Sequence, residues 1–303
     1  MEFGVSFRNY GDNSTPETML RIAKAAEQFG FDTLWATDHI VTMHDVWTGN
    51  PDGPAMFDST FYEPVATLHW LAPQTTLRLG IGTLILPYRE PLLAAKMLAG
   101  LDRLSGGRLI IGAASGWVAS EFTALGVPFN ERGQRSNEIL RLWKQCWTGS
   151  DPLAFEGRFH PFEAVHFQPR PIQNSPPLWI GGNSIAAMKR AIEYGDGWFP
   201  ASTTPTETAD KMALLRTLAQ KKQKDISDYS IAVRRTARPQ GSDAKMHNRA
   251  ALTGSSEQIV IDCKAYLDAG VTHLALEFDF DNVGHFLEDM QQIGEEVIPI
   301  VTP

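Results

Sequence analysis

Apolar segments typical of β-strands alternate with amphipathic helical segments along the whole chain, and this alternation is the feature that most restricts its possible folds. Eight strand-then-helix units occur within 303 residues. Such alternation indicates parallel strands with helices packed outside them, and eight units of this length fit a closed barrel better than an open, doubly wound sheet. The expected strands lie at residues 2–7, 33–37, 78–86, 108–114, 177–182, 197–201, 230–237 and 273–279.

No change in composition and no linker divides the chain. We therefore expect one α/β domain, a single (β/α)8 TIM barrel, over residues 1–303. One insertion follows the fourth strand and its helix, at residues 151–173, where alternating apolar and polar residues predict a hairpin.

Capping residues mark the ends of two expected helices. Thr15 precedes the first helix and Gly30 follows it, while Ser255 or Ser256 begins the helix before the last strand and Gly270 ends it. Hydroxyl side chains accept hydrogen bonds from the unpaired amides of a first turn, and glycine permits the left-handed conformation that ends many helices. These signals indicate where the two helices begin and end.

The balance of charges argues against several classes of function. Thirty-five acidic residues against 27 basic ones give a formal net charge of -8, and the one short basic run, at residues 220–224, is typical of a solvated helix face. Nucleic acid is therefore not an expected partner. The chain has no stretch of eighteen uninterrupted apolar residues and no signal-peptide pattern, so no membrane association is expected. Cys146 and Cys263 are expected to be buried free thiols, which fits a cytoplasmic protein.

Several familiar catalytic patterns are missing from the sequence. His160, His166, His247 and His285 show no metal-binding spacing with Cys, Asp or Glu, and we expect no metal. No serine stands in a nucleophile elbow, and no glycine-rich dinucleotide fingerprint follows a strand. These absences weigh against a hydrolase and against a nicotinamide-dependent enzyme.

Polar and glycine residues gather where four of the expected strands end. They are Asp38-His39, Gly82-Thr83, Ser115-Gly116-Trp117 and Gly181 to Ser184. In a (β/α)8 barrel the carboxyl ends of the strands form one face, which carries the chemistry, so these groups should share one opening. The last group precedes a helix. It is either an anion site at a helix N-terminus or a tight connection capped by Ser184.

Four longer segments resemble the bacterial luciferase-like superfamily, and within it the oxidoreductases that use the deazaflavin coenzyme F420. They are "GFDTLWATDH" (30–39), "LRLGIGTLILPYREPLLAAKMLAGLDRLSGGRLIIGAASGW" (77–117), "WIGGNSIAAMKRAIEYGDGWFP" (179–200) and "AYLDAGVTHLALEF" (265–278). The resemblance implies the same barrel fold and a homodimer. It also implies that Gly181, Gly182, Asn183 and Ser184 contact the phosphate of a flavin or deazaflavin tail.

The resemblance assigns further roles to the other strand ends. It implies a non-prolyl cis peptide at Gly82-Thr83, behind the isoalloxazine ring, with Ser115, Gly116 and Trp117 also at the cofactor. Asp38 is expected at the deazaflavin head and His39 beside the transfer site, where a residue with a pKa near neutrality can handle a proton. From the dipeptide alone, a capping Asp and a core His remain the alternative.

At two positions the chain departs from the alcohol and sugar-phosphate dehydrogenases of this group. They carry a Glu after the glycine of strand four and a Trp soon after the His, where this chain has Trp117 and Met43. Trp117 is expected in an apolar wall over the ring or substrate, with core packing as the alternative. Glu121 either points back to the pocket or lies at the surface or a helix cap. Met43, His44 and Trp117 are the expected substrate-pocket residues.

Three functions follow in order of preference. The first is an F420-dependent oxidoreductase that transfers a hydride between the deazaflavin and a small organic substrate, with His39 as the catalytic residue. The second is an FMNH2-dependent flavin monooxygenase on the same scaffold, with FMN as the cofactor. The third is a flavin- or deazaflavin-binding protein without catalysis. The protein supplies position and exclusion of water in the first two cases, and the cofactor supplies the electron chemistry.

Overall fold

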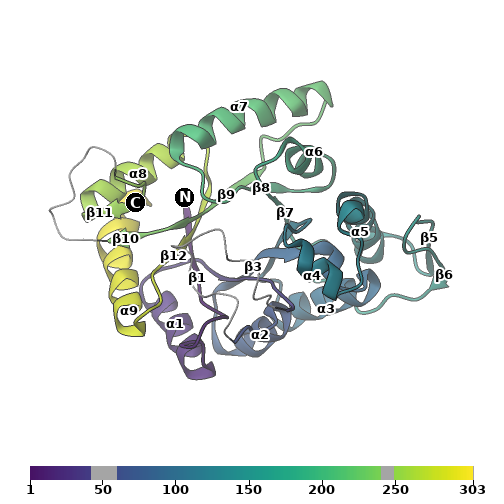
Figure 1. The fold of residues 1–303 in the computed structure, drawn as a ribbon, viewed down its shortest axis with the longest axis horizontal. Coiled ribbons are helices and arrows are strands. Elements are labelled where there is room, and N and C mark those ends of the chain that lie inside the picture. The colour runs from purple at the N-terminus through teal and green to yellow at the C-terminus, as the bar shows by residue number, and fades with distance from the viewer. Residues whose placement is uncertain (42–59, 240–248, 303) are drawn as a thin grey trace.

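The computed structural model describes residues 1–41, 60–239 and 249–302, and within them eight parallel strands close into a barrel (Figure 1). The strands follow one another around it in the order β1, β2, β3, β4, β7, β8, β9, β12, and β12 pairs with β1. Their bounds are β1 (Glu2–Ser6), β2 (Thr33–Ala36), β3 (Arg78–Ile85), β4 (Leu109–Ala114), β7 (Leu178–Gly181), β8 (Gly197–Phe199), β9 (Ser230–Thr236) and β12 (His273–Glu277). The predicted TIM barrel is confirmed.

Helices surround the barrel and cover the apolar outer faces of its strands (Figure 1). They are α1 (Pro16–Gln28), α2 (Pro64–Leu71), α3 (Pro91–Leu104), α4 (Ala119–Ala124), α5 (Arg132–Thr148), α6 (Ile185–Tyr194), α7 (Pro205–Lys221), α8 (Ser256–Asp268), α9 (Val283–Gln292) and α10 (Ile298–Val301). Within the described residues, none of these helices is long and apolar enough to span a membrane.

The expected caps form as the sequence predicts. The side chain of Thr15 accepts a hydrogen bond from the amide of Thr18, and Ser255 accepts one from the amide of Gln258. Gly30 and Gly270 adopt positive φ angles of 77° and 91° directly after their helices, where a residue with a Cβ would be strained.

The predicted hairpin is also present. Strands β5 (Leu153–Phe155) and β6 (Phe162–Val165) pair antiparallel and project beyond α5, away from the barrel (Figure 1). A second small sheet joins β10 (Arg238–Pro239) to β11 (Thr253–Gly254). Both additions leave the barrel closed.

Aromatic side chains fill the inside of the barrel. Trp35, Trp179 and Phe199 form a buried cluster in which their ring centroids lie 5.0 to 6.3 Å apart. Gly4 and Gly80 face the Trp35 ring, and a Cβ on either would come within 2.3 Å of it. The interior is thus packed, and the open space lies at the carboxyl ends of the strands.

Candidate functional site

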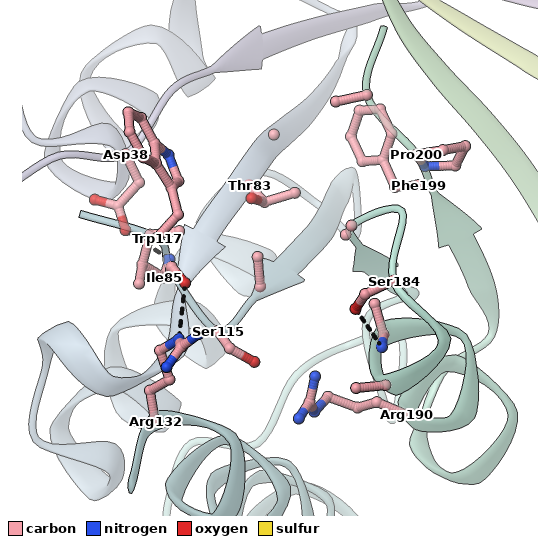
Figure 2. Close-up of a pocket in the computed structure, with 18 of the residues that line it drawn as sticks. Asp38, Thr83, Ile85, Ser115, Trp117, Arg132, Ser184, Arg190, Phe199 and Pro200 are labelled. Atoms are coloured by element: carbon pink, nitrogen blue, oxygen red, sulfur yellow. Dashed lines mark hydrogen bonds between the residues drawn. The ribbon is translucent and has the colours of Figure 1, made fainter. Parts of the chain in front are cut away.

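A cavity of about 560 Å³ opens at the carboxyl ends of the barrel strands (Figure 2). Its wall includes most of the residues that the sequence singles out, which the barrel brings together from four separate strand ends. These are Asp38, His39, Gly82, Thr83, Ser115, Gly116, Trp117, Gly181, Gly182 and Ser184. A concave site of this size at this face suits a small cofactor and its substrate.

One predicted residue, Asn183, is described but is not part of this wall. The Asn183 side chain turns away to bond the backbone of Ala201, through Nδ2 to the carbonyl oxygen at 2.9 Å and through Oδ1 from the amide at 3.1 Å. Met43 and His44 lie outside the described residues. The structure therefore gives Asn183 a local role in holding the turn after β7.

The end of β3 forms one side of the cavity. The Gly82–Thr83 peptide is cis, as the resemblance implies, and the pairing of β3 with β4 shifts register between Ile81 and Leu84. The Thr83 side chain faces the cavity (Figure 2), and its Cγ2 would lie 2.7 Å from a Cβ on Gly181. Glycine at 181 is thus required by the close approach of the two strand ends.

The turn after β7 carries the start of helix α6. Gly182 has a φ of 116°, a conformation that side chains with a Cβ rarely adopt, and the Ser184 hydroxyl accepts a hydrogen bond from the Ala187 amide at 3.2 Å. The first amides of α6 therefore lie at the cavity wall with the positive end of the helix dipole. This is a favourable place for an anion.

Two arginines that the sequence analysis did not identify complete this end of the cavity. Figure 2 shows the side chains of Arg132, from α5, and Arg190, from α6, directed toward the region where Ser115 and Ser184 lie. In the described part of the chain, neither guanidinium has a carboxylate within ion-pair distance; Arg132 bonds the carbonyl oxygens of Gly116 and Phe129. Two positive charges without a carboxylate counter-ion among the described residues make this end of the cavity suitable for an anion.

Buried polar atoms at this end support the same conclusion. Arg190 donates to Asn137 Oδ1 at 2.8 Å and to the Gly133 carbonyl at 3.2 Å. Burial lowers the pKa of Arg190 from its usual value; Tyr194 works against this shift, and the neighbouring charge of Arg132 adds to it. The Ser115 hydroxyl is buried and bonds to none of the described residues, so it is available to a ligand.

Asp38 is held by an arginine. Its two carboxylate oxygens accept hydrogen bonds from Arg89 at 2.7 and 2.8 Å, and one of them also accepts the Ile85 amide at 2.8 Å. Arg89 is itself shared with Glu63, at 2.5 Å. The carboxylate lines the cavity, but its main contacts tie the end of β2 to the end of β3.

His39 belongs to a buried network around Glu121. Its Nδ1 lies 2.8 Å from Glu121 Oε2, which also accepts the Tyr88 hydroxyl at 2.7 Å, while Oε1 accepts the Ile40 amide at 2.7 Å. The Glu121 side chain is fully buried and His39 is only 7% exposed. Burial opposes ionisation of Glu121, but these hydrogen bonds outweigh it and hold its pKa below the usual 4.5.

The surface alternative for Glu121 is therefore wrong, and so is the core alternative for Trp117. Glu121 stands in the first turn of α4 and points inward, whereas Trp117 lines the cavity with 60% of its surface exposed. The sequence alone does not show that Glu121 points inward, because a charged residue in the first turn of a short helix is usually exposed to solvent. Its position becomes evident only from its contact with His39, which is distant in the sequence. A carboxylate thus lies directly behind His39, which itself lines the cavity.

The arrangement combines three chemical properties in one cavity. One end is cationic, one wall has a histidine backed by a buried carboxylate, and Phe199, Ile85 and Trp117 add apolar surface. Such a cavity can bind a planar ring with an anionic tail and exchange a proton with a molecule beside that ring. In the described residues, no cluster of three or more His, Cys, Asp or Glu side chains is arranged to hold a metal.

Two relatives of known activity differ in cofactor. The chain is 38% identical over 143 residues to an FMNH2-dependent dimethylsulfone monooxygenase from Pseudomonas putida, covering 46% of this chain and 39% of that protein. It is 26% identical to an F420-dependent glucose-6-phosphate dehydrogenase from Amycolatopsis mediterranei, covering 97% of each. The chain thus spans about two fifths of the first relative and nearly all of the second.

A comparison with solved structures finds the same barrel fold in an F420-dependent enzyme. An F420-dependent secondary alcohol dehydrogenase, solved with an F420–acetone adduct, superposes with a TM-score of 0.79 over 100% of this chain and 99% of its own, at 16% identity. The sequence model of the family described as "Luciferase-like monooxygenase" matches residues 1–250. Together with the closed barrel, this match shows that the chain belongs to the luciferase-like monooxygenase family of F420- or flavin-dependent oxidoreductases.

Proposed function

We propose that this protein is a coenzyme F420-dependent oxidoreductase that transfers a hydride between the deazaflavin and a small organic substrate. The observation that carries the proposal is that His39 lines a cavity whose other end is cationic and is paired, on the side away from the cavity, with the buried Glu121. A hydride transfer to or from a carbon next to oxygen needs a proton partner near neutral pH, and this histidine is placed to serve as one.

The cavity fits a cofactor with an anionic tail. Arg132, Arg190 and the start of helix α6 would hold its phosphate, with the Ser184 and Ser115 hydroxyls beside it. Thr83 and the glycines at 82 and 181 would lie against the ring, because all three line the side of the cavity formed by the ends of β3 and β7. When bound, the cofactor accepts or supplies the hydride.

Glu121 and Tyr88 act on His39 rather than on the substrate. An ionised Glu121 accepts a hydrogen bond from Nδ1, which fixes the ring and stabilises the protonated imidazole when His39 takes up a proton. Tyr88 and the Ile40 amide hold the carboxylate itself in place. The departure from the dehydrogenases at Trp117 is in this way offset by a carboxylate four positions later.

Titration of the purified protein with F420 and with FMN tests the proposal, since both cofactors are fluorescent. We expect saturable F420 binding that is tighter than FMN binding, and hydride transfer to or from an organic substrate. Tight FMN binding without measurable F420 binding would overturn the choice of cofactor.

A second candidate is an FMNH2-dependent monooxygenase. One observation favours it: Arg132 and Arg190, which have no carboxylate partner among the described residues, match the nearly two negative charges of a terminal phosphate such as that of FMN. Substrate-dependent oxygen consumption with reduced FMN would support this candidate. Cofactor binding without turnover over a broad substrate panel would instead support a binding protein without catalysis.

The family resemblance and the surface also support a homodimer. Trp70 on α2 and Leu93 and Leu104 on α3 are 38%, 57% and 74% exposed on the two helices that follow β2 and β3. A pair of neighbouring helices with apolar outer residues is typical of an interface. A stable monomer in sedimentation at micromolar concentration would contradict the dimer. The buried free thiols of Cys146 and Cys263 fit the proposed cytoplasmic location.

A further inference from the structure

Arg234 links four strands at the mouth of the barrel. It stands on β9, its Nη1 donates to the Gly82 carbonyl on β3 at 2.7 Å, and its Nη2 donates to the Thr37 hydroxyl after β2 at 3.2 Å. Its Nε donates to Glu277 on β12 at 2.8 Å. Arg234 also lines the cavity, apart from the phosphate end and from the His39–Glu121 pair.

The Arg234–Glu277 pair is oriented with its positive end toward the cavity. Arg234 belongs to the cavity wall and Glu277 does not, while the two side chains are 23% and 19% exposed. Burial works against both charges, yet the attraction between them raises the pKa of Arg234 and lowers that of Glu277, so both stay ionised at neutral pH. The charged guanidinium of Arg234 therefore lies beside Gly82, which is expected to face the ring of the cofactor.

We propose that Arg234 raises the reduction potential of the bound cofactor and that Glu277 moderates this effect. The inference rests on the proposed function, because it requires a deazaflavin or flavin ring in this cavity. Its physical basis is general: a hydride brings one negative charge to the ring, and a nearby cation stabilises the reduced form more than the oxidised form. Glu277, on the far side of the guanidinium, weakens that stabilisation.

Removing each member of the pair should shift the potential in opposite directions. Arg234→Met removes the cation and leaves Glu277, so reduced cofactor should bind less tightly relative to oxidised cofactor. Glu277→Gln leaves the cation unopposed, so reduced cofactor should bind more tightly relative to oxidised. Arg234→Lys keeps the charge and should restore most of the wild-type ratio, although it loses the planar contacts.

The measurement is the dissociation constant of oxidised and of reduced F420, and of oxidised and reduced FMN, for each protein under anaerobic conditions. By linkage, the ratio of the two constants gives the shift of the cofactor's reduction potential when it binds. We expect Arg234→Met to change this ratio by on the order of tenfold, which is about 30 mV for a two-electron couple. The thermal midpoint of each variant checks that it is folded.

A nearby exposed ion pair provides the matched control. Arg238 donates to Asp279 at 2.7 Å next to the same strands, but neither residue lines the cavity. Arg238→Met and Asp279→Asn should leave the ratio unchanged. Shifts of the same sign in Arg234→Met and Glu277→Gln, or equal losses for both redox forms, would show a purely structural role and overturn the inference. A wild-type protein that binds neither cofactor would overturn the proposed function and this inference with it.

Discussion

Nδ1 of His39 lies 2.8 Å from Oε2 of Glu121, although 82 positions separate the two residues in the chain. The contact joins the end of β2 to the first turn of α4 and is buried on both sides. Because an ionised carboxylate can only accept, Nδ1 carries the hydrogen in this pair. In the proposed reaction, His39 would therefore exchange its proton with the substrate through Nε2.

Glu121→Gln should lower turnover while leaving cofactor affinity nearly unchanged. The glutamine keeps the shape of the side chain but removes the negative charge that stabilises a protonated His39. We expect a loss of about 10- to 100-fold in kcat, smaller than the loss on removal of His39 itself. Steady-state kinetics and a fluorescence titration on the same preparation measure the two quantities.

The pH dependence of stability separates a folding defect from a chemical one. The pKa of Glu121 is lowered in the folded protein, so its ionised form adds stability above pH 4.5, and this stability is lost as the pH falls through the folded value. The difference in unfolding free energy between wild type and Glu121→Gln should be about 1–3 kcal/mol at pH 7. It should shrink in acid, and a difference that is constant with pH would contradict the ionised pair.

His39→Asn and Gly182→Val should have complementary effects. His39→Asn removes the proton partner and is expected to lower turnover by about 10² to 10⁴ with cofactor affinity intact. Gly182 has a φ of 116°, where valine is strained, so Gly182→Val should weaken cofactor binding instead. An asparagine variant with unaltered turnover at every pH would remove His39 from the mechanism.

The sequence predicted the elements of this fold well because most of them carry local signals. Helix α1 spans Pro16–Gln28, between the expected cap Thr15 and the expected stop Gly30, and the hairpin at residues 151–173 follows from alternation alone. Helix α4 was missed because it has only six residues and no side-chain cap. Such short elements are held by their tertiary contacts rather than by propensity.

The site was predicted where it lies on strand ends and missed where it lies on helices. The barrel rule places the ends of β2, β3, β4 and β7 at one opening, and Thr83 and Ser184 are found there. Nothing local distinguishes Arg132 or Arg190 from a solvated arginine, since their direction depends on how α5 and α6 pack. Asp38 does lie at a predicted strand end, but its pairing with Arg89 could not be inferred from the dipeptide Asp38-His39.

Asp289→Asn should stabilise the protein at neutral pH. Burial raises the pKa of Asp289, on α9, to about 6, with the help of Asp279 and Glu288 and against the effect of His285. The unfolded chain ionises near the ordinary value of 3.8, so folding becomes less favourable as the pH rises from 3.8 through 6. After allowance for solvent exposure, we expect a gain of about 1 kcal/mol at pH 7.5.

Urea unfolding at several pH values tests this expectation. The gain of Asp289→Asn over wild type should be absent near pH 3.5 and grow until about pH 6, since both proteins are uncharged at this position in acid. Asp281→Asn, at an exposed position nearby, serves as the control. Equal gains at all pH values would mean that the substitution acts through packing or helix propensity rather than through ionisation.

Arg190→Met and Arg132→Met should weaken cofactor binding only when the ligand carries its phosphate. A hydrogen bond between charged groups contributes about 1.5–3 kcal/mol, so each variant should bind FMN about 10- to 100-fold less tightly than wild type. Riboflavin lacks the phosphate and should bind all three proteins alike, and the same contrast is expected between F420 and its phosphate-free deazaflavin core. Arg141→Met is the matched control, because Arg141 is exposed on α5 and does not line the cavity. An equal loss for FMN and riboflavin would place the arginines at the ring or in the fold, and would exclude them from the phosphate site.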